Sequence, residues 1–483
     1  MKLKKELYIA VRQTQLTVQK KEHYLEIPQI VNRLAEQIAT HTYQPGPYTC
    51  FAISDPTPRE ILAPSYPDRI VHRWLVNKME PYIDKRFLDC SYANRTGKGH
   101  HRAVKQLQCY LQNPANKYYL KMDIESFFNT IDHAVLLQLV KRWLEKMPCA
   151  SPELPRLSGR GTQKDTSLNK EKALLLKEAR LLSQGLQAPL SADEKVEQSD
   201  IPTQNEVKWR ELSIEKLYLL NVCQTIITHN PTKNVIYTGA QEKLKIIPRQ
   251  KSYFHNAPGK GLPLGNLSSQ FFANIYLHEL DWFVKHKLPS PNGEGQGVRY
   301  YLRYVDDIVL LAENTEQLTC WRDALKNFLK NELKLNAHPK KTILQPACYG
   351  IDFLGYIVRK DYLLVRRRVV KNFKRKLYFF NRLLNSEKYI YYSCIGSSKL
   401  EKMYRKRKLK IPVQPSPELL KNILCCINSY YGILRFANTY KLRRDIYLNH
   451  FKGLQKYFYA TNHFEKIGLL SKYKNLQQAT VLL

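Results

Sequence analysis

Residues 301–312, YLRYVDDIVLLA, place two adjacent carboxylates, Asp306 and Asp307, inside an otherwise apolar run. The tyrosine, leucine, isoleucine and valine residues around the pair favour β-strands, so the pattern predicts a hairpin with both aspartates at its tip. Aspartate is common in turns for reasons unrelated to chemistry, so this hairpin alone indicates no function.

A third carboxylate, Asp123, ends a second strand pattern, KYYLKMDI at 117–124. The residues after it, ESFFNTIDHAVLLQLVKRWL, have the apolar spacing of a helix with Asp132 at its N-cap. Two strand ends can meet in space, and three clustered carboxylates repel one another unless cations lie between them. Hard divalent ions such as Mg²⁺ take oxygen ligands, and a pair about 4 Å apart serves in-line phosphoryl displacement.

The net charge of the chain indicates the partner of such a site. The sequence contains 77 Lys and Arg residues against 42 Asp and Glu, a formal charge of +35, which favours an extended polyanion. No apolar run approaches the roughly 20 residues of a membrane-spanning helix, and the N-terminus lacks a secretory apolar region. We therefore expect a soluble, cytoplasmic protein with no membrane association, which performs nucleotidyl transfer on a nucleic acid.

Two further segments differ in composition. Residues 55–75, DPTPREILAPSYPDRIVHRWL, contain several prolines and arginines and predict a positively charged loop. Residues 148–211 are rich in Ser, Gln, Lys and Glu around one amphipathic block, EKALLLKEARLLSQGL, and are expected to form a partly mobile insertion. The ten cysteines include no C-x-x-C pair, which argues against a zinc cluster or a disulfide framework.

Several motifs resemble those of reverse transcriptases. YVDD at 304–307 resembles their Y-x-D-D signature, and DIESFFNTIDH from Asp123 resembles the motif with the first catalytic aspartate. GLPLGNLSSQFFANIYLHELD at 261–281 is similar to their nucleotide-gripping and template-gripping motif, and DFLGY at 352–356 to the primer-grip hairpin. SYANRTGKGHHRA and INSYYGILRFANTYKLR look most like the bacterial enzymes of diversity-generating retroelements and of phage-defence-associated groups.

The resemblance implies an α+β right-hand polymerase fold with fingers, a palm of antiparallel sheet backed by helices, and a basic α-helical thumb. The expected boundaries are an N-terminal extension and fingers at 1–115, the first part of the palm at 116–147, and the insertion at 148–211. Fingers and palm continue over 212–357 with the YVDD hairpin and primer grip, and the thumb and tail occupy 358–483.

The resemblance also assigns catalytic roles. Asp123 and Asp306 would bridge two Mg²⁺ ions, with Mn²⁺ as an alternative, while Asp307 supports the cluster and the backbone carbonyl of Ile124 completes one metal shell. Lys341 matches the basic residue that protonates the leaving pyrophosphate, and neighbouring Lys340 is nearly as good a match.

Substrate-binding residues follow in the same way. Arg59 and Arg69 match positions that hold the incoming triphosphate, and Phe128 matches the ring that blocks a ribose 2′-hydroxyl, so deoxynucleotides are the expected substrates. The remaining nucleotide-binding candidates are Leu264, Gly265, Asn266 and Gln270. The candidates for contact with the nucleic acid are Arg95, Lys98, Gly355, Tyr430, Asn438 and Arg443. Leu264 stands where many relatives have glutamine, which removes a polar contact and predicts lower fidelity.

The leading hypothesis is an RNA-directed DNA polymerase that makes cDNA from a cognate structured non-coding RNA, in antiphage defence. The alternatives are a low-fidelity diversity-generating enzyme, a template-independent or protein-primed polymerase, and a catalytically silent RNA-binding scaffold. Because only a short polar tail follows the thumb, we expect no RNase H, endonuclease or integrase domain. Priming and template choice would then depend on that RNA, an accessory protein or a homo-oligomer.

Overall fold

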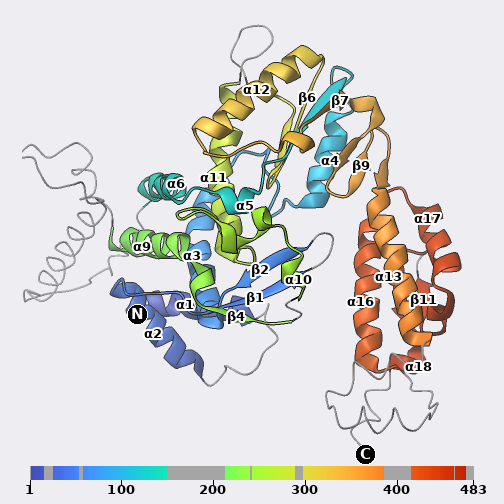
Figure 1. Ribbon diagram of the computed structural model, residues 1–483, viewed down its shortest axis with the longest axis horizontal. Coiled ribbons are helices and arrows are strands. Elements are labelled where there is room, and N and C mark those ends of the chain that lie inside the picture. Colours follow the sequence, from blue (N-terminus) through green and yellow to red (C-terminus); the bar gives the residue numbers. More distant parts are fainter. Residues whose placement is uncertain are drawn as a thin grey trace, which may run out of the picture.

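The computed structural model describes residues 2–15, 26–53, 58–148, 213–239, 242–288, 297–385, 415–461 and 463–474 (Figure 1). The chain has an α+β fold, as the sequence predicts. The expected insertion and its amphipathic block lie outside the described residues except for Pro148. No helix among the described residues is long and apolar enough to cross a membrane. The eight cysteines within them carry free thiols.

A four-stranded antiparallel sheet lies at the centre of the structure. It contains β3 (Tyr118–Met122), β5 (Tyr301–Tyr304), β6 (Asp307–Ala312) and β7 (Ile343–Pro346), in the order β5-β6-β3-β7. The hairpin of β5 and β6 confirms the prediction from residues 301–312, with Tyr304 opposite Asp307. Since β3 and β6 are neighbours, the two strand ends that carry aspartates meet, as expected.

The two faces of this sheet pack against different layers. Leu120, Met122, Ile308 and Leu310 belong to the larger core, which helices cover. These helices are α6 (His133–Lys146), α11 (Leu267–His286) and α12 (Thr315–Asn331). Asp132 caps α6 by accepting a hydrogen bond from the Val135 amide at 3.1 Å, which confirms its predicted position.

The opposite face packs against a second, smaller sheet and one helix. The second sheet contains β8 (Ile351–Phe353), β9 (Tyr356–Val358) and β10 (Leu363–Val365), and the helix is α4 (His100–Tyr110). Tyr119, Val309 and Leu311 face this layer in a separate core. Leu354 and Gly355 form the β8–β9 turn with φ values of 49° and 91°, as a two-residue hairpin of the primed type requires.

A third sheet lies toward the N-terminal part of the chain (Figure 1). It has the order β2-β1-β4, from β2 (Arg59–Ala63), β1 (Tyr48–Ile53) and β4 (Val235–Tyr237). The expected loop at 55–75 is wrong for its described part, because β2 is followed there by helix α3 (Tyr66–Ile83). Ser65 caps this helix, and Pro67 lies in its first turn, where a missing N–H costs no hydrogen bond.

The C-terminal helical unit, described over residues 367–385, 415–461 and 463–474, forms its own core. It contains α13 (Arg367–Asn385), α16 (Pro417–Arg435), α17 (Tyr440–Asp445), α18 (Ser471–Lys474) and a hairpin of β11 (Phe458–Thr461) and β12 (Lys466–Leu469). The sequence predicted the helices and not the hairpin. In Figure 1 this unit extends from the β8–β10 sheet.

The remaining helices pack around the β2-β1-β4 sheet and the larger core. They are α1 (Lys2–Gln15), α2 (Ile27–Ala39), α5 (Phe127–Thr130), α9 (Ile214–Thr228) and α10 (Glu242–Lys245). Short 3-10 or π turns occupy Asp84–Arg86, Pro231–Lys233, Arg249–Lys251, Tyr253–His255, Pro339–Lys341, Ala347–Tyr349, Ile446–His450 and Lys452–Lys456.

Candidate active site

The three predicted aspartates lie at one end of the four-stranded sheet. Asp123 follows β3 directly and is 7% exposed, Asp306 lies in the β5–β6 turn, and Asp307 begins β6. The last pair between β3 and β6 is Met122 with Ile308, so one step further along the same register brings Asp123 opposite Asp307. The structure therefore brings the three carboxylates together.

The electrostatics of the site reflect this crowding. Burial, then the neighbouring carboxylates of Asp123 and Asp307, raise the pKa of Asp306 to about 7. Burial also raises the pKa of Asp307, while the ammonium group of Lys121 acts in the opposite direction. Burial and the neighbouring carboxylates thus disfavour a further negative charge on Asp306.

Two lysines supply the nearest positive charge. Lys341 forms an ion pair with Asp123, and Lys121 lies with its Nζ 3.5 Å from Oδ1 of Asp307. Lys341 belongs to the short Pro339–Lys341 turn and its side chain is 56% exposed, whereas the Lys121 side chain is 14% exposed. Lys341 therefore reaches the site from the solvent side, and Lys121 from within the sheet.

The donor set suits a hard divalent cation in kind, because all three side chains offer carboxylate oxygen. Among the described residues, no group of three or more His, Cys, Asp or Glu side chains is already arranged so that it could hold a metal ion. The Ile124 backbone is held by hydrogen bonds on either side of it, from the Glu125 amide to Asn336 and from the His338 amide to Asp123. In this antiparallel bridge between Ile124 and Ala337, the carbonyl of Ile124 points away from Ala337.

A buried arginine supports the turn that carries Asp306. Arg303 is 1% exposed and binds Asp281 through Nε at 2.7 Å and Nη2 at 2.6 Å. It also donates to the Ser91 hydroxyl at 2.9 Å and to the Val305 carbonyl at 3.2 Å. Val305 has a φ of 54°, which is uncommon for a β-branched residue, so Arg303 holds the backbone in a strained conformation next to Asp306.

The two predicted triphosphate ligands lie on adjacent elements. Arg59 is the exposed first residue of β2. Arg69, on α3, is half-buried and donates from Nε to the Pro64 carbonyl at 3.0 Å, which fixes its stem against the β2–α3 connection. The two arginines can therefore contact one triphosphate only if it lies next to both β2 and the start of α3.

The segment at 261–265, which contains Gly261 and Gly265, connects β2 of the third sheet to α5. The Leu264 carbonyl accepts a hydrogen bond from the Leu62 amide at 2.9 Å, and the Leu262 amide donates to the Phe128 carbonyl at 2.7 Å. Gly265 has a φ of 115°, and a Cβ there would lie 2.8 Å from Cγ2 of Ile61. The Leu264–Gly265 segment thus needs glycine for both its backbone angle and its close approach to β2.

The side chains around this segment differ in exposure. Phe128 is half-buried, with its ring centroid 5.3 Å from that of Phe127, and Gln270 is exposed on the first turn of α11. Asn266 is 1% exposed, and its Nδ2 donates to the Tyr48 hydroxyl at 3.4 Å. Gln270 and Gly265 are accessible to a substrate, whereas the Asn266 side chain faces the interior.

Two of the predicted nucleic-acid ligands serve as internal braces. Arg95 pairs with Asp84 at 2.6 Å and donates to the backbone carbonyls of Leu88 and Ser91, at 2.7 Å and 3.1 Å. Lys98 pairs with Asp89 and donates to its carbonyl at 3.0 Å. Both side chains are less than a tenth exposed, so little of either is available to a nucleic acid.

Three predicted ligands in the C-terminal part are also engaged internally. Tyr430 is 9% exposed and stacks on Phe373, and Arg443 is 7% exposed and donates to the Phe464 carbonyl at 3.0 Å. Asn438 accepts from the Leu363 amide at 2.9 Å and fastens the C-terminal helical unit to β10. A Cβ at Gly355, in the β8–β9 turn, would lie 4.0 Å from Cγ2 of Val369.

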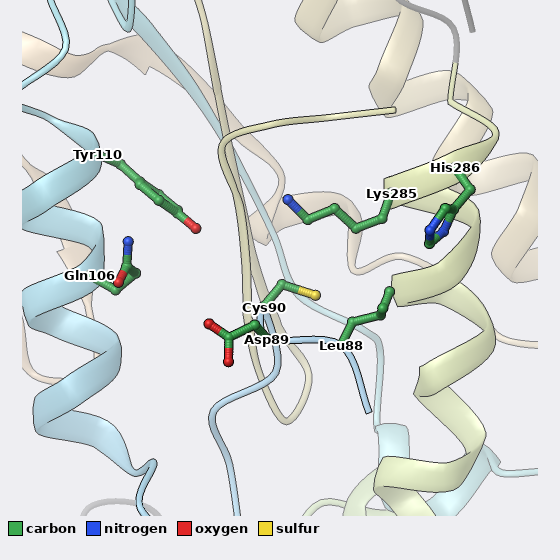
Figure 2. A pocket seen from close by; sticks show the side chains of 7 residues that line it. All are labelled: Leu88, Asp89, Cys90, Gln106, Tyr110, Lys285 and His286. Carbon is green, nitrogen blue, oxygen red and sulfur yellow. The ribbon is translucent and has the colours of Figure 1, made fainter. Parts of the chain in front are cut away.

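A cavity of about 290 Å³ lies elsewhere in the molecule (Figure 2). Gln106 and Tyr110 of α4 face Lys285 and His286 of α11 across it, and residues 88–90 close one side. The Cys90 carbonyl accepts a hydrogen bond from the Arg303 amide, so the cavity borders the outer edge of β5. It contains none of the three aspartates and is distinct from the candidate active site.

The sequence analysis missed Lys121 and Arg303. A signal for each was present, because a charged residue in an otherwise apolar strand pattern, two positions before Asp123 or three before Asp306, requires a buried partner. What the sequence did not contain was the identity of that partner, since Asp281 and Asp352 lie on other elements.

Comparisons with known proteins agree with this site. Residues 206–358 match the family model described as "Reverse transcriptase (RNA-dependent DNA polymerase)". A segment of 153 residues is 26% identical to the group II intron-encoded protein LtrA of Lactococcus lactis subsp. cremoris, covering 20% of this chain and 26% of LtrA. The chain thus spans about a quarter of the length of that relative.

Two further similarities cover more of the chain. Protein YkfC of Escherichia coli (strain K12) is 21% identical over 367 residues, covering 70% of this chain and 73% of YkfC. A solved structure of telomerase from Candida tropicalis with a fragment of telomeric RNA aligns with 92% of this chain and 64% of its own, at 12% identity and a TM-score of 0.37. The residues that match the family model include Asp306, Asp307 and Lys341, whereas Asp123 lies outside the matched range.

Proposed function

We propose that this protein is an RNA-directed DNA polymerase that uses divalent metal ions at Asp123, Asp306 and Asp307. The observation that carries the proposal is the cluster itself, in which two adjacent strand ends bring three carboxylates together. Burial, and then the neighbouring carboxylates, raise the pKa of Asp306 to about 7. Such a cluster needs cations to hold its negative charge. The match of residues 206–358 to the reverse transcriptase family supports the same conclusion.

In this proposal the chain holds and orients the reacting groups. Asp123, Asp306 and the Ile124 carbonyl would hold the ions, and Asp307 would support them from β6. Bound Mg²⁺ would supply activation of the primer hydroxyl and stabilisation of the leaving pyrophosphate. Lys341, which pairs with Asp123, would protonate that pyrophosphate.

The substrate-binding residues complete the proposal. Arg59 and Arg69 neutralise the triphosphate of the incoming nucleotide, and the ring of Phe128 excludes a ribose 2′-hydroxyl. Gly265 lets the backbone approach the base pair closely, and Gln270 contacts the nucleotide or template from the first turn of α11. The central sheet then corresponds to the palm, the β2-β1-β4 sheet to the fingers, and the C-terminal helical unit to the thumb.

A charge-neutral substitution tests the reaction. Purified protein with a primed RNA template, deoxynucleotides and Mg²⁺ should extend the primer, and Asp306→Asn should reduce the rate by about three orders of magnitude or more, because the cluster loses a carboxylate that would hold the ions. Asp323→Asn on the exposed surface of α12 is the matched control and should extend at the wild-type rate. Undiminished extension by Asp306→Asn would overturn the proposal.

We also propose a template for the polymerase and a biological role for its cDNA product. The template is a structured non-coding RNA, and the cDNA serves antiphage defence in the cytoplasm. The charge of +35 supports a polyanionic partner of this kind. Sequencing the RNA and cDNA that co-purify with the protein decides the role. Repetitive cDNA from one such RNA supports defence, whereas adenine-templated errors in a variable gene segment would indicate a diversity-generating enzyme.

A further inference from the structure

We propose that Lys121 is a positioning residue that ties the aspartate turn to the β8–β9 hairpin, and thereby fixes the carboxylates relative to the DFLGY segment, whose sequence resembles a primer-grip hairpin. This inference rests on the proposed polymerase function. It concerns a residue that neither the family motifs nor the predicted catalytic set includes.

The place of Lys121 in the sheet is unusual for a lysine. It is the fourth residue of β3, paired with Val309 of β6 on one side and Ile343 of β7 on the other, so it lies on an interior strand. It shares a sheet face with Tyr119, which is buried in the apolar core. An ammonium group in such a place costs free energy unless it is paired and hydrogen-bonded.

The partners of the ammonium group belong to two different hairpins. Nζ of Lys121 donates to the backbone carbonyl of Asp352, in β8, at 2.8 Å. The same atom lies 3.5 Å from Oδ1 of Asp307, in β6. A single amine therefore connects the strand that begins with a catalytic carboxylate to the strand that leads into the Leu354–Gly355 turn.

The chain of contacts continues toward the C-terminal helical unit. The carboxylate of Asp352 forms an ion pair with Arg366, and the Arg366 amide donates to the Gly355 carbonyl at 2.9 Å. Arg366 directly precedes α13. Asp307, Lys121, Asp352 and Arg366 thus form a continuous polar path from the carboxylate cluster to the residue that precedes that helix.

A lysine with this geometry affects the relative position of the two hairpins more than the binding of a metal ion. Its positive charge partly neutralises Asp307, so its removal leaves the cluster no less attractive to a divalent cation. What its removal abolishes is the tie between the two hairpins. A displacement of about 1 Å between reacting atoms costs on the order of 100-fold in rate. Loss of Lys121 should therefore lower the rate constant and spare the metal affinity.

The test compares Lys121→Met and Lys121→Arg with Lys117→Met. Lys117 also pairs with a carboxylate, Glu313 at 2.9 Å, but on the exposed surface at the far end of the strand, so it is a matched control. In single-turnover extension, Lys121→Met should lower the maximal rate by about 10- to 100-fold. The half-saturating concentrations of deoxynucleotide and Mg²⁺ should stay within about twofold of wild type or, for Mg²⁺, fall.

A second measurement needs neither metal nor turnover. A primer with 2-aminopurine at its 3′ end, bound to the protein in EDTA, reports the surroundings of the primer terminus. Lys121→Met should change this fluorescence, and Lys121→Arg should restore both fluorescence and rate to within about fivefold, because arginine retains the charge and the donors. Asp352→Asn, which weakens the next contact along the path, should give the same change in smaller degree.

The outcomes separate the two proposals. Absence of extension by the wild-type protein would contradict the polymerase function itself. Extension and fluorescence of Lys121→Met equal to those of Lys117→Met would overturn the role of Lys121. A loss of rate that merely follows a lower melting temperature, or a rise in half-saturating Mg²⁺ without a fall in maximal rate, would also overturn it. If Lys121→Met does not fold, Asp352→Asn decides the question by the fluorescence measurement: a change supports the role of Lys121, and wild-type fluorescence overturns it.

Discussion

At the scale of single residues, Gly265 shows how one backbone angle positions a site. Its φ of 115° lies in a region that residues with a Cβ rarely adopt, and the space for a Cβ is already filled by Ile61 at 2.8 Å and the Leu62 carbonyl at 3.2 Å. The adjacent Leu264 carbonyl is bonded to the Leu62 amide. Gly265 therefore fixes the distance between the start of α11 and β2.

Gly265→Ala should lower the free energy of unfolding by about 1 to 3 kcal/mol and raise the half-saturating deoxynucleotide concentration, because the segment must move away from β2. Chemical denaturation and steady-state extension measure the two effects. The matched control is Gly432→Ala within α16, where a Cβ meets nothing within 4 Å. This control should be neutral or stabilise by up to about 1 kcal/mol. Equal stability of Gly265→Ala and wild type would contradict the steric argument.

At the scale of secondary-structure elements, α3 and α11 meet through a neutral histidine. His72 on α3 is 1% exposed, and its Nδ1 lies 2.6 Å from Oγ of Ser268 in the first turn of α11. Burial, and to a lesser extent His229, lower the pKa of His72 to about 3. The packing of these two helices therefore depends on an uncharged imidazole.

The stability of the protein should depend on pH through this contact. The folded pKa of His72 lies below the ordinary value of 6.5, so its contribution is complete above pH 6.5 and is lost as the pH falls toward 3. Between pH 7.5 and pH 5 the loss is about 2 kcal/mol. Denaturation at both pH values should show a correspondingly smaller pH dependence for His72→Gln.

A substitution of the partner residue distinguishes titration from simple loss of a contact. Ser268→Ala removes the hydrogen bond and retains the histidine, so it should lower stability by about 1 kcal/mol at both pH values without changing the difference between them. If His72→Gln shows the same pH dependence as wild type, another group is responsible for the acid sensitivity.

At the scale of the whole molecule, part of the net charge of +35 is displayed along α13 as exposed basic residues. Arg367, Lys371 and Arg375 are exposed along this helix, followed by Tyr378 at 64% and Phe379 at 57% exposure. Basic residues interleaved with exposed rings favour contact with a sugar-phosphate backbone and its bases. In Figure 1 α13 lies in the unit that extends from the β8–β10 sheet.

Affinity for primed RNA should therefore fall steeply with salt, and α13 should account for part of the dependence. Arg375→Gln should reduce the slope of log affinity against log salt concentration by about 0.7 to 0.9, the value for one lost phosphate contact. Tyr378→Ala should lower affinity by about 1 to 3 kcal/mol with no change in slope. Lys330→Gln, on exposed α12, is the control. An unchanged slope for Arg375→Gln would exclude α13 as a phosphate-binding surface.

Much of the candidate site was predictable because its signals are local. The strand pattern of residues 301–312 and the strand that ends at Asp123 were correct, as was the N-cap Asp132. These features depend on side-chain alternation and on hydrogen bonds between residues close in sequence. The expected loop at 55–75 failed for the same reason, because prolines in a first helical turn were interpreted as breaks.

The sequence by itself determined which residues can form the carboxylate cluster, and its charge of +35 favours a polyanionic partner. Only the tertiary structure decided which charges remain available for that purpose. Arg95 and Arg443 looked like ligands and are engaged internally, while Lys121 and Arg303 looked like strand residues and hold the aspartate turn. The physical reason is that a buried charge needs partners, and strand register and helix packing, which join residues far apart in sequence, determine those partners.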